Sequence, residues 1–207
     1  MSTGRTDAFT DGVFAIAITL LVLEIHLPEF PSAPDNAAML HALEGLGESL
    51  GTYLLSFATI GIIWMNHNVT HRTWKHADRL GNAFNLLLLA VVCFIPYPTA
   101  LVSKYGPLEA STALYGATFA LMSIAYVLDW AYGTHLQHRY DATMPDLSLR
   151  DALPGLIGVV GYIVGTALAF VSPTLAVCIY VAITIYYAVP GVFTRKRDAL
   201  RAETDTP

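Results

Sequence analysis

Charged side chains are scarce in this sequence. Asp, Glu, Lys and Arg make up 13% of its 207 residues, whereas hydrophobic residues make up 55%; a soluble domain usually carries about 25% charged residues. Charge is missing altogether from residues 49–71, 80–103, 110–128 and 152–194. A helix of about 20 residues crosses a bilayer, so the first three stretches suit one crossing each and the fourth suits two. The composition excludes an ordinary soluble domain and indicates an integral membrane protein.

Cysteine is also scarce, with Cys93 and Cys178 both inside charge-free stretches. Buried cysteine usually behaves as a small apolar side chain, so we expect no disulfide and no cysteine metal site. The sequence lacks a P-loop, a nucleophile elbow and a Cys-pair metal motif. We therefore expect no enzyme activity, no cofactor and no binding to nucleic acid. The basic residues 195–197 are interpreted as a membrane-flanking stop signal.

Hydropathy predicts an all-α fold, a single transmembrane domain over residues 1–207. The approximate spans are six: 6–27, 48–70, 80–102, 109–131, 152–171 and 174–194. The last two are separated at Ser172–Pro173, because proline does not continue a helix smoothly. The first span is the weakest, since its charge-free run reaches only from Gly12 to Leu23. It is not interpreted as a secretory signal peptide, because it starts with Asp7 and Asp11 instead of basic residues.

The basic residues predict the orientation of these spans. With six spans and the N-terminus inside, ten of the eleven Lys and Arg residues fall on the cytoplasmic side and only Lys104 lies outside. Positive residues favour the cytoplasmic side. The chain is therefore expected to be a multi-pass protein of the plasma membrane with both termini in the cytoplasm. The argument is weakest for the first span, because only Arg5 would change sides if that helix did not cross.

The first span has an aliphatic stripe along one face. At about 100° per residue, Ile16, Leu20 and Leu23 fall on this stripe, with Thr19 beside them. Pattern alone leaves two environments open. The stripe faces lipid, or it faces a symmetry axis at which copies of the helix line a pore that rings of Ile or Leu can dewet. The sequence has no TVGYG-type carbonyl filter, so any ion selectivity would depend on pore width and the cost of dehydration.

Two carboxylates lie on the opposite face of this span. Asp7 and Asp11 are about 180° and 220° around the helix from Ile16. A charge at membrane depth normally faces protein or water. The expected partners are polar groups at the same depth: Arg5, Asn66, His67, Asn82 and Asn85. The alternative is capping of the helix N-terminus, where aspartate is favoured.

The same segment carries a long and unusual motif. Arg5-x-x-x-Phe9-Thr10-Asp11-Gly12 is followed by Val-Phe-Ala-Ile-Ala-Ile-Thr-Leu-Leu-Val-Leu-Glu-Ile, and the second span ends with Trp64-Met-Asn-His67. The third span contains Asn85-Leu-Leu-Leu-Leu and Phe94-Ile-Pro-Tyr-Pro-Thr99. This pattern resembles the R-x-x-x-F-S-D signature region of the endolysosomal potassium channel family known as transmembrane protein 175. The resemblance covers about the first half of the chain; the last three spans match in number and hydropathy.

The resemblance implies a potassium-preferring cation channel that conducts passively as a homotetramer in a lipid bilayer and also admits other monovalent cations. The first helix would line the pore, with a hydrophobic constriction at Ile16, Leu20 and Leu23. The hydroxyl of Thr19 would be linked to selectivity. The other matched residues would brace that helix: Arg5, Phe9, Thr10, Asp11, Trp64, Asn66, His67 and Asn85. Thr10 stands where the family has Ser, and Tyr97 where it has Phe, and both keep the hydroxyl or the ring.

Two other functions are compatible with the residues. A proton-coupled transporter would use Asp11, His67 or Glu24, and a small membrane enzyme would use a histidine-based site. His67 and His71 have the i, i+4 spacing of a helical metal pair, but no acidic or cysteine ligand lies near them in the sequence. Zinc or haem is therefore not expected there, and His67 is interpreted as a hydrogen-bonding brace.

Overall fold

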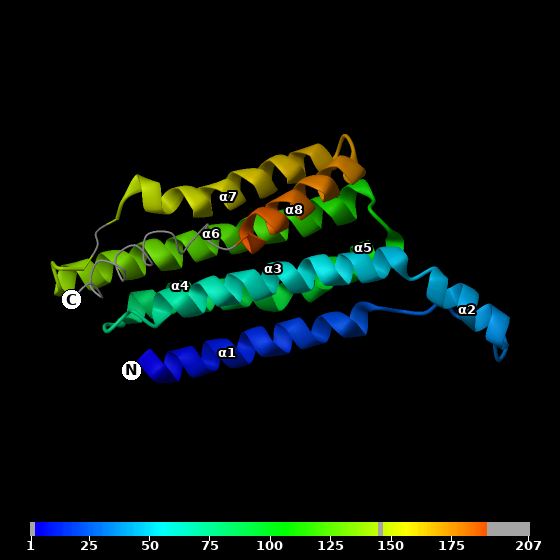
Figure 1. The fold of residues 1–207 in the computed structure, drawn as a ribbon, viewed down its shortest axis with the longest axis horizontal. Helices are drawn as coiled ribbons and strands as arrows, with labels where there is room; N and C mark the ends of the chain where they lie inside the picture. The colour runs from blue at the N-terminus through cyan, green and yellow to red at the C-terminus, as the bar shows by residue number, and fades with distance from the viewer. Residues whose placement is uncertain (1–2, 145–146, 190–207) are drawn as a thin grey trace, which may run out of the picture.

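The structure, a computed structural model, describes residues 3–144 and 147–189, and all of its regular elements in these ranges are helices. They are α1 Thr3–Leu20, the 3-10 helix η1 Leu21–Glu24, α2 Asn36–Glu44, α3 Gly47–His71, α4 Arg79–Phe94, α5 Pro96–Tyr105, α6 Glu109–Tyr140, α7 Leu149–Ala169 and α8 Pro173–Ala188. The long helices lie side by side in one bundle, and α2 projects from one end of it (Figure 1). The predicted all-α class is confirmed.

Five helical stretches within the described ranges are long and apolar enough to cross a bilayer. They are Gly4–Glu24, Gly47–His71, Arg79–Tyr105, Glu109–Tyr140 and Leu149–Ala169. α8 is apolar but has 16 described residues, a length of about 24 Å. The chain is therefore membrane-embedded, and the sixth span stays a prediction. Residues 190–194 of that predicted span lie outside the described residues.

Two helical segments extend beyond the predicted spans. α2 lies within the polar segment 28–46, where Asp35 caps it by accepting a 2.8 Å hydrogen bond from the backbone N–H of Ala38. α6 continues past the predicted end at residue 131 as far as Tyr140. Hydropathy does not indicate such segments, because they carry polar residues at the edge of the membrane or outside it.

The third predicted span is two helices, α4 and α5, that meet at Ile95. Pro96 and Pro98 have no backbone N–H, so two hydrogen bonds of a continuous helix are missing at this point. The helical pattern resumes where the N–H of Thr99 donates to the carbonyl of Ile95 at 3.2 Å. The Thr99 hydroxyl also donates to that carbonyl, at 2.8 Å. The break between α4 and α5 follows from the two prolines, which hydropathy treats as ordinary residues of the span.

α7 and α8 form a hairpin where the sequence predicts one. α7 ends at Ala169 and α8 begins at Pro173, and the Ser172 side chain accepts a hydrogen bond from the N–H of Leu175. The two helices approach closely at Gly165, where a Cβ atom would lie 2.5 Å from the ring of Tyr180. Tyr180 in turn packs against α6. The glycine therefore allows an aromatic residue to fill the centre of the α6–α7–α8 contact.

Polar contacts fix the loop between α3 and α4 against α6. The side chain of Gln137 accepts from the backbone N–H groups of Lys75 and His76 at 2.8 and 3.1 Å, and donates to the carbonyl of His76 at 2.7 Å. Asp78 caps α4 by accepting from the N–H of Gly81 at 2.7 Å. The Tyr132 hydroxyl donates to the same carboxylate at 2.5 Å, and this hydrogen bond holds the pKa of Asp78 below its usual range.

Tyr132→Phe is expected to weaken this anchor in a pH-dependent way. Because the folded-state pKa of Asp78 is depressed, its favourable contribution is present above the usual carboxyl pKa and is lost as pH falls through the folded value. Losing one hydrogen bond to a half-exposed carboxylate costs about 1 kcal/mol, or about 2–4 °C in Tm. The thermal unfolding temperature in detergent should be lower than that of the wild type by this amount at neutral pH, and by a smaller amount in acid. The control is Tyr105→Phe, because Tyr105 is exposed. An equal loss of unfolding temperature at every pH in Tyr132→Phe would contradict the prediction.

Candidate functional site

One face of α1 packs into the bundle. Thr10, Phe14, Ala17 and Leu21 are each at most 1% exposed. Their spacing of four, three and four residues places them on one side of the helix, where α1 contacts α3 and α4. This buried face fixes the rotation of α1 about its own axis.

The opposite face of α1 is open. Ile16, Leu20 and Leu23 are 61%, 42% and 63% exposed, and Thr19 is exposed beside them. The Thr19 hydroxyl donates within its own helix, with the carbonyls of Ile16 and Ala15 at 2.9 and 3.0 Å. Its hydrogen is therefore turned towards the backbone, which leaves the oxygen lone pairs free to accept. The aliphatic stripe predicted from the helical wheel thus lies on the surface of the single chain, with one hydroxyl oxygen along it.

A buried chain of hydrogen bonds joins the N-terminal half of α1 to α4 and α3. Asn85 donates to the hydroxyl of Thr10 at 2.8 Å, and its side-chain oxygen lies 3.1 Å from Nε2 of His67. All three side chains are at most 3% exposed. Three helices are therefore linked through one amide whose donor and acceptor are both used.

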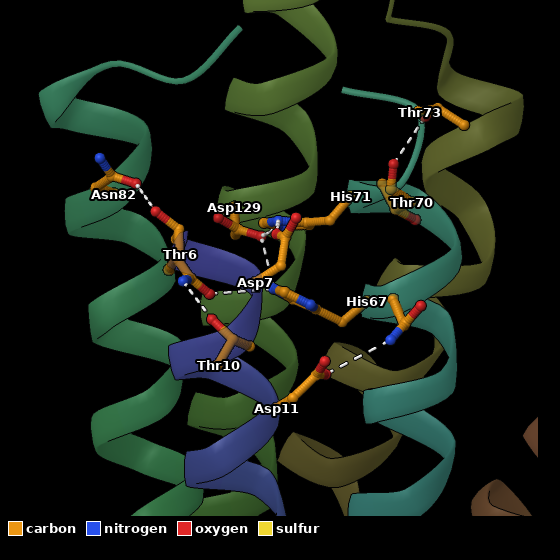
Figure 2. Close-up of polar contacts among 12 residues, drawn as sticks. Thr6, Asp7, Thr10, Asp11, His67, Thr70, His71, Thr73, Asn82 and Asp129 are labelled. Atoms are coloured by element: carbon orange, nitrogen blue, oxygen red, sulfur yellow. Dashed lines mark hydrogen bonds and ion pairs between the residues drawn. The ribbon is translucent and has the colours of Figure 1, made fainter. Parts of the chain in front are cut away.

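The two carboxylates of α1 are directed towards neighbouring helices, as Figure 2 shows. Asp11 accepts from the indole N–H of Trp64 at 2.8 Å, and from the amide of Asn68 at a weaker 3.5 Å. Asp7 lies 3.6 Å from Nδ1 of His71. Both contacts are with α3, so the two carboxylates on the acidic face of the helix have protein partners near the N-terminal end of α1.

The C-terminal end of the first span is attached to the bundle as well. The Ser103 hydroxyl lies 3.0 Å from the carbonyl of Glu24, the last residue of η1. It also lies 2.8 Å from the Ser49 hydroxyl on α3. The first span is therefore attached near both of its ends, and the open stripe lies between these attachments.

The predicted bracing residues separate into two groups. Thr10, Asp11, Trp64, His67 and Asn85 make the interhelical contacts described above. The others do not join them: Arg5 and Phe9 have exposed side chains, and Asn66 contributes its carbonyl to the hydroxyl of Thr70. Phe9 is seven residues before Ile16 and lies on the same side of α1 as the stripe. It is 57% exposed and is not part of the contact with α3 and α4.

Several contact residues were not among the predicted bracing residues. They are Thr6, Asn68, His71, Ser103 and Asp129. Asp129 is 3% exposed and lies on α6, where its Oδ2 is 2.9 Å from Nε2 of His71. It is 58 residues from that histidine along the chain, so spacing could not indicate the pair. The one usable signal was its charge near the end of an apolar span.

These features define a class: a helical membrane protein whose first helix is attached at both ends and exposes an aliphatic stripe carrying a single hydroxyl. The chain belongs to the TMEM175 family. Residues 5–96 match the family described as the endosomal/lysosomal potassium channel TMEM175, and they contain α1 from Arg5 onwards and the partners on α3 and α4 described above.

Relatives match over nearly the whole chain. A potassium channel from Streptomyces collinus is 34% identical over 201 residues, which cover 95% of this chain and 96% of that protein. The crystal structure of a lysosomal potassium-selective channel TMEM175 homolog from Chamaesiphon minutus has a TM-score of 0.76 and 34% identity. It covers 90% of this chain and 96% of that chain. The human endosomal/lysosomal proton channel TMEM175 is 35% identical over 101 residues, 46% of this chain and 20% of that protein.

Proposed function

We propose that this chain is a subunit of a potassium-preferring cation channel, in which copies of α1 surround a central pore. The observation that carries the proposal is the open stripe of Ile16, Leu20 and Leu23 on a helix attached at both ends. A helix attached in this way holds its exposed face at a fixed rotation, which a pore lining requires. The names of the bacterial relatives, potassium channel and potassium-selective channel, support the ion and the class.

The proposed constriction is the aliphatic stripe itself. Rings of branched side chains close a pore by excluding water, and an ion cannot cross a dry apolar segment without losing its hydration shell. Thr19 supplies the hydroxyl oxygen of the stripe, and its proton is directed to the backbone. A ring of such oxygens would replace part of the hydration shell of a passing cation. Potassium loses its hydration shell at lower cost than sodium, which gives the proposed preference.

A homotetramer is the proposed assembly, with both termini in the cytoplasm of the cell whose plasma membrane holds it. Four chains of 22.5 kDa give a protein mass of 4 × 22.5 = 90 kDa. Light scattering on the purified protein, corrected for bound detergent, measures this mass directly. A dimer of 45 kDa would contradict the proposed pore.

Potassium flux from liposomes tests the proposed function. Purified protein is reconstituted with a potassium gradient, and efflux is compared with protein-free liposomes and with a sodium gradient of the same size. We expect passive efflux that exceeds the protein-free control and is faster for potassium than for sodium. Efflux at the level of protein-free liposomes, or equal rates for both ions, would refute the proposal.

Proton movement is the second candidate function. It is favoured by the name of the human relative, a proton channel, and by two titratable side chains in contact, Asp7 on the proposed pore helix and His71 on α3. The same liposomes carrying a pH-sensitive dye measure proton flux in parallel. Proton flux without potassium flux would favour this candidate. Saturable, pH-coupled uptake of an organic solute would instead favour a transporter that uses Asp11 or His67.

A further inference from the structure

Two histidines and one carboxylate converge at the inner end of the bundle. His67 and His71 are one turn apart on α3, with stacked rings whose centroids are 3.7 Å apart. Asp129 reaches them from α6. One donor atom from each of the three side chains lies within 4.8 Å of the other two. The potassium channel proposed above does not need this convergence, because none of the three side chains belongs to the open stripe of α1.

The spacing of the donor atoms fits a small divalent ion. Oδ2 of Asp129 lies 2.9 Å from Nε2 of His71 and 3.7 Å from Nε2 of His67. Zinc takes ligands at about 2.0–2.1 Å in a tetrahedron, so neighbouring ligand atoms are about 3.3 Å apart. Small side-chain movements of about half an ångström would bring these two distances to that value. The two distances from Asp129 are therefore within about half an ångström of the separation that zinc requires, and the two histidine nitrogens lie within 4.8 Å of each other.

A second carboxylate orients one of the histidines. His71 directs Nε2 towards Asp129 and Nδ1 towards Asp7, whose Oδ1 is 3.6 Å away (Figure 2). Metal-binding histidines almost always place the other ring nitrogen against a carboxylate or carbonyl, which fixes the ring and makes it a stronger ligand. The arrangement Asp7–His71 thus provides the outer contact that a metal site requires.

The site borders a cavity on one side. This cavity of about 30 Å³ is lined by Asp7, His71 and Trp74, among others, but not by the buried His67 and Asp129. That is enough space for a water molecule, which could complete the four ligands. Two existing contacts must change: Nε2 of His67 is 3.1 Å from the side-chain oxygen of Asn85, and Nε2 of His71 is hydrogen-bonded to Oδ2 of Asp129 at 2.9 Å. A metal ion would take both nitrogens in place of these hydrogen bonds, and Asn85 would keep its hydrogen bond to Thr10.

The geometry points to a site for a divalent transition-metal ion of the zinc class, bound by His67, His71 and Asp129 and supported by Asp7. Two imidazole nitrogens and one carboxylate oxygen suit zinc or cobalt, whereas magnesium and calcium prefer oxygen ligands throughout. The ion would join α3 to α6 and, through Asp7, to the pore helix. This site is additional to the proposed function and does not depend on conduction.

Zinc titration of the purified full-length protein in detergent tests the site by calorimetry. We expect one zinc ion per chain for the wild type. His71→Gln and Asp129→Asn should each weaken binding by about 100-fold or more, and Asp7→Asn by about 10–100-fold. The matched control is His41→Gln, since His41 lies near Glu44 on α2 and both side chains are well exposed. Magnesium should not compete at the same concentration.

Cobalt provides a readout on the wild type alone. Co²⁺ in a tetrahedral site of nitrogen and oxygen ligands absorbs strongly in the visible range, whereas octahedral Co²⁺ absorbs weakly. A strong visible band that zinc abolishes is the expected result. A weak octahedral spectrum would overturn the proposal. It would also be overturned if His71→Gln and Asp129→Asn eluted like the wild type on size exclusion and bound zinc with unchanged affinity. Loss of potassium flux would leave these results unchanged, so the two proposals fail separately.

Discussion

Replacing Ile16 by asparagine is expected to raise cation flux through the protein and to weaken its discrimination against sodium. Ile16 is 61% exposed and is the first residue of the open stripe. A ring of amides at this position would hold water where a ring of isoleucines excludes it, so the barrier to a hydrated ion falls. Lowering that barrier by about 1.4 kcal/mol raises the rate about tenfold. Flux from liposomes under matched potassium and sodium gradients measures both effects.

The control for this substitution is Val160→Asn. Val160 is 58% exposed on α7, so its replacement also places an amide on an open helical face, away from α1. We expect the flux of this variant to equal that of the wild type. Leu20→Asn should act in the same direction as Ile16→Asn, because Leu20 lies one turn along the same stripe. If both stripe variants conduct like the wild type, the stripe is not the constriction.

The helices themselves could be predicted because membrane spans are defined by length and by the absence of charge, both of which are local properties of the sequence. The break between α4 and α5 and the outer helix α2 could not be predicted in this way. The break depends on the missing N–H groups of Pro96 and Pro98. α2 depends on the cap at Asp35 within a polar segment. Capping and proline chemistry have to be examined separately from hydropathy.

The rotation of the first helix could also be predicted, because its two faces differ in chemistry. Placing Asp7 and Asp11 opposite Ile16 was enough to separate a protein-facing side from an open side. Their partners were harder to identify. Asp11 contacts Trp64 instead of the nearby amide of Asn66, since the choice depends on the rotation of α3 relative to α1. A helical wheel gives the rotation of one helix and says nothing about its neighbour.

The partner of the histidine pair could not be predicted from the sequence either. His67 and His71 were not expected to bind metal because no acidic residue lies near them in the sequence. The structure brings Asp129 to within 2.9 Å of His71 from a helix 58 residues away. In a helical membrane protein, side chains that contact each other come from different spans at similar depth, so proximity in sequence does not identify such pairs. Depth in the membrane, given by the position within each span, is the better criterion.

Asn85→Leu is expected to cause the largest loss of stability among the substitutions considered. Leucine keeps the approximate shape of asparagine but has no hydrogen-bonding groups. The Thr10 hydroxyl would lose its 2.8 Å donor and the His67 ring its 3.1 Å partner, with both groups at most 3% exposed. Leaving such groups unpaired costs about 2 kcal/mol or more, even after allowing for the modest value of interhelical hydrogen bonds in membranes. The thermal unfolding temperature in detergent should fall by about 4–8 °C.

Asn82→Leu is the matched control, since Asn82 has the same side chain three residues earlier on the same helix. Its contact with the hydroxyl of Thr6 is longer, at 3.3 Å, and only partly buried. Water at the inner end of the bundle can replace that contact, so we expect a change of about 1 °C or less. Equal losses in both variants would show that the buried chain Thr10–Asn85–His67 has no special role. A large loss in Asn85→Leu alone, with reduced flux, would show that attachment of α1 to its neighbours supports both the fold and the pore.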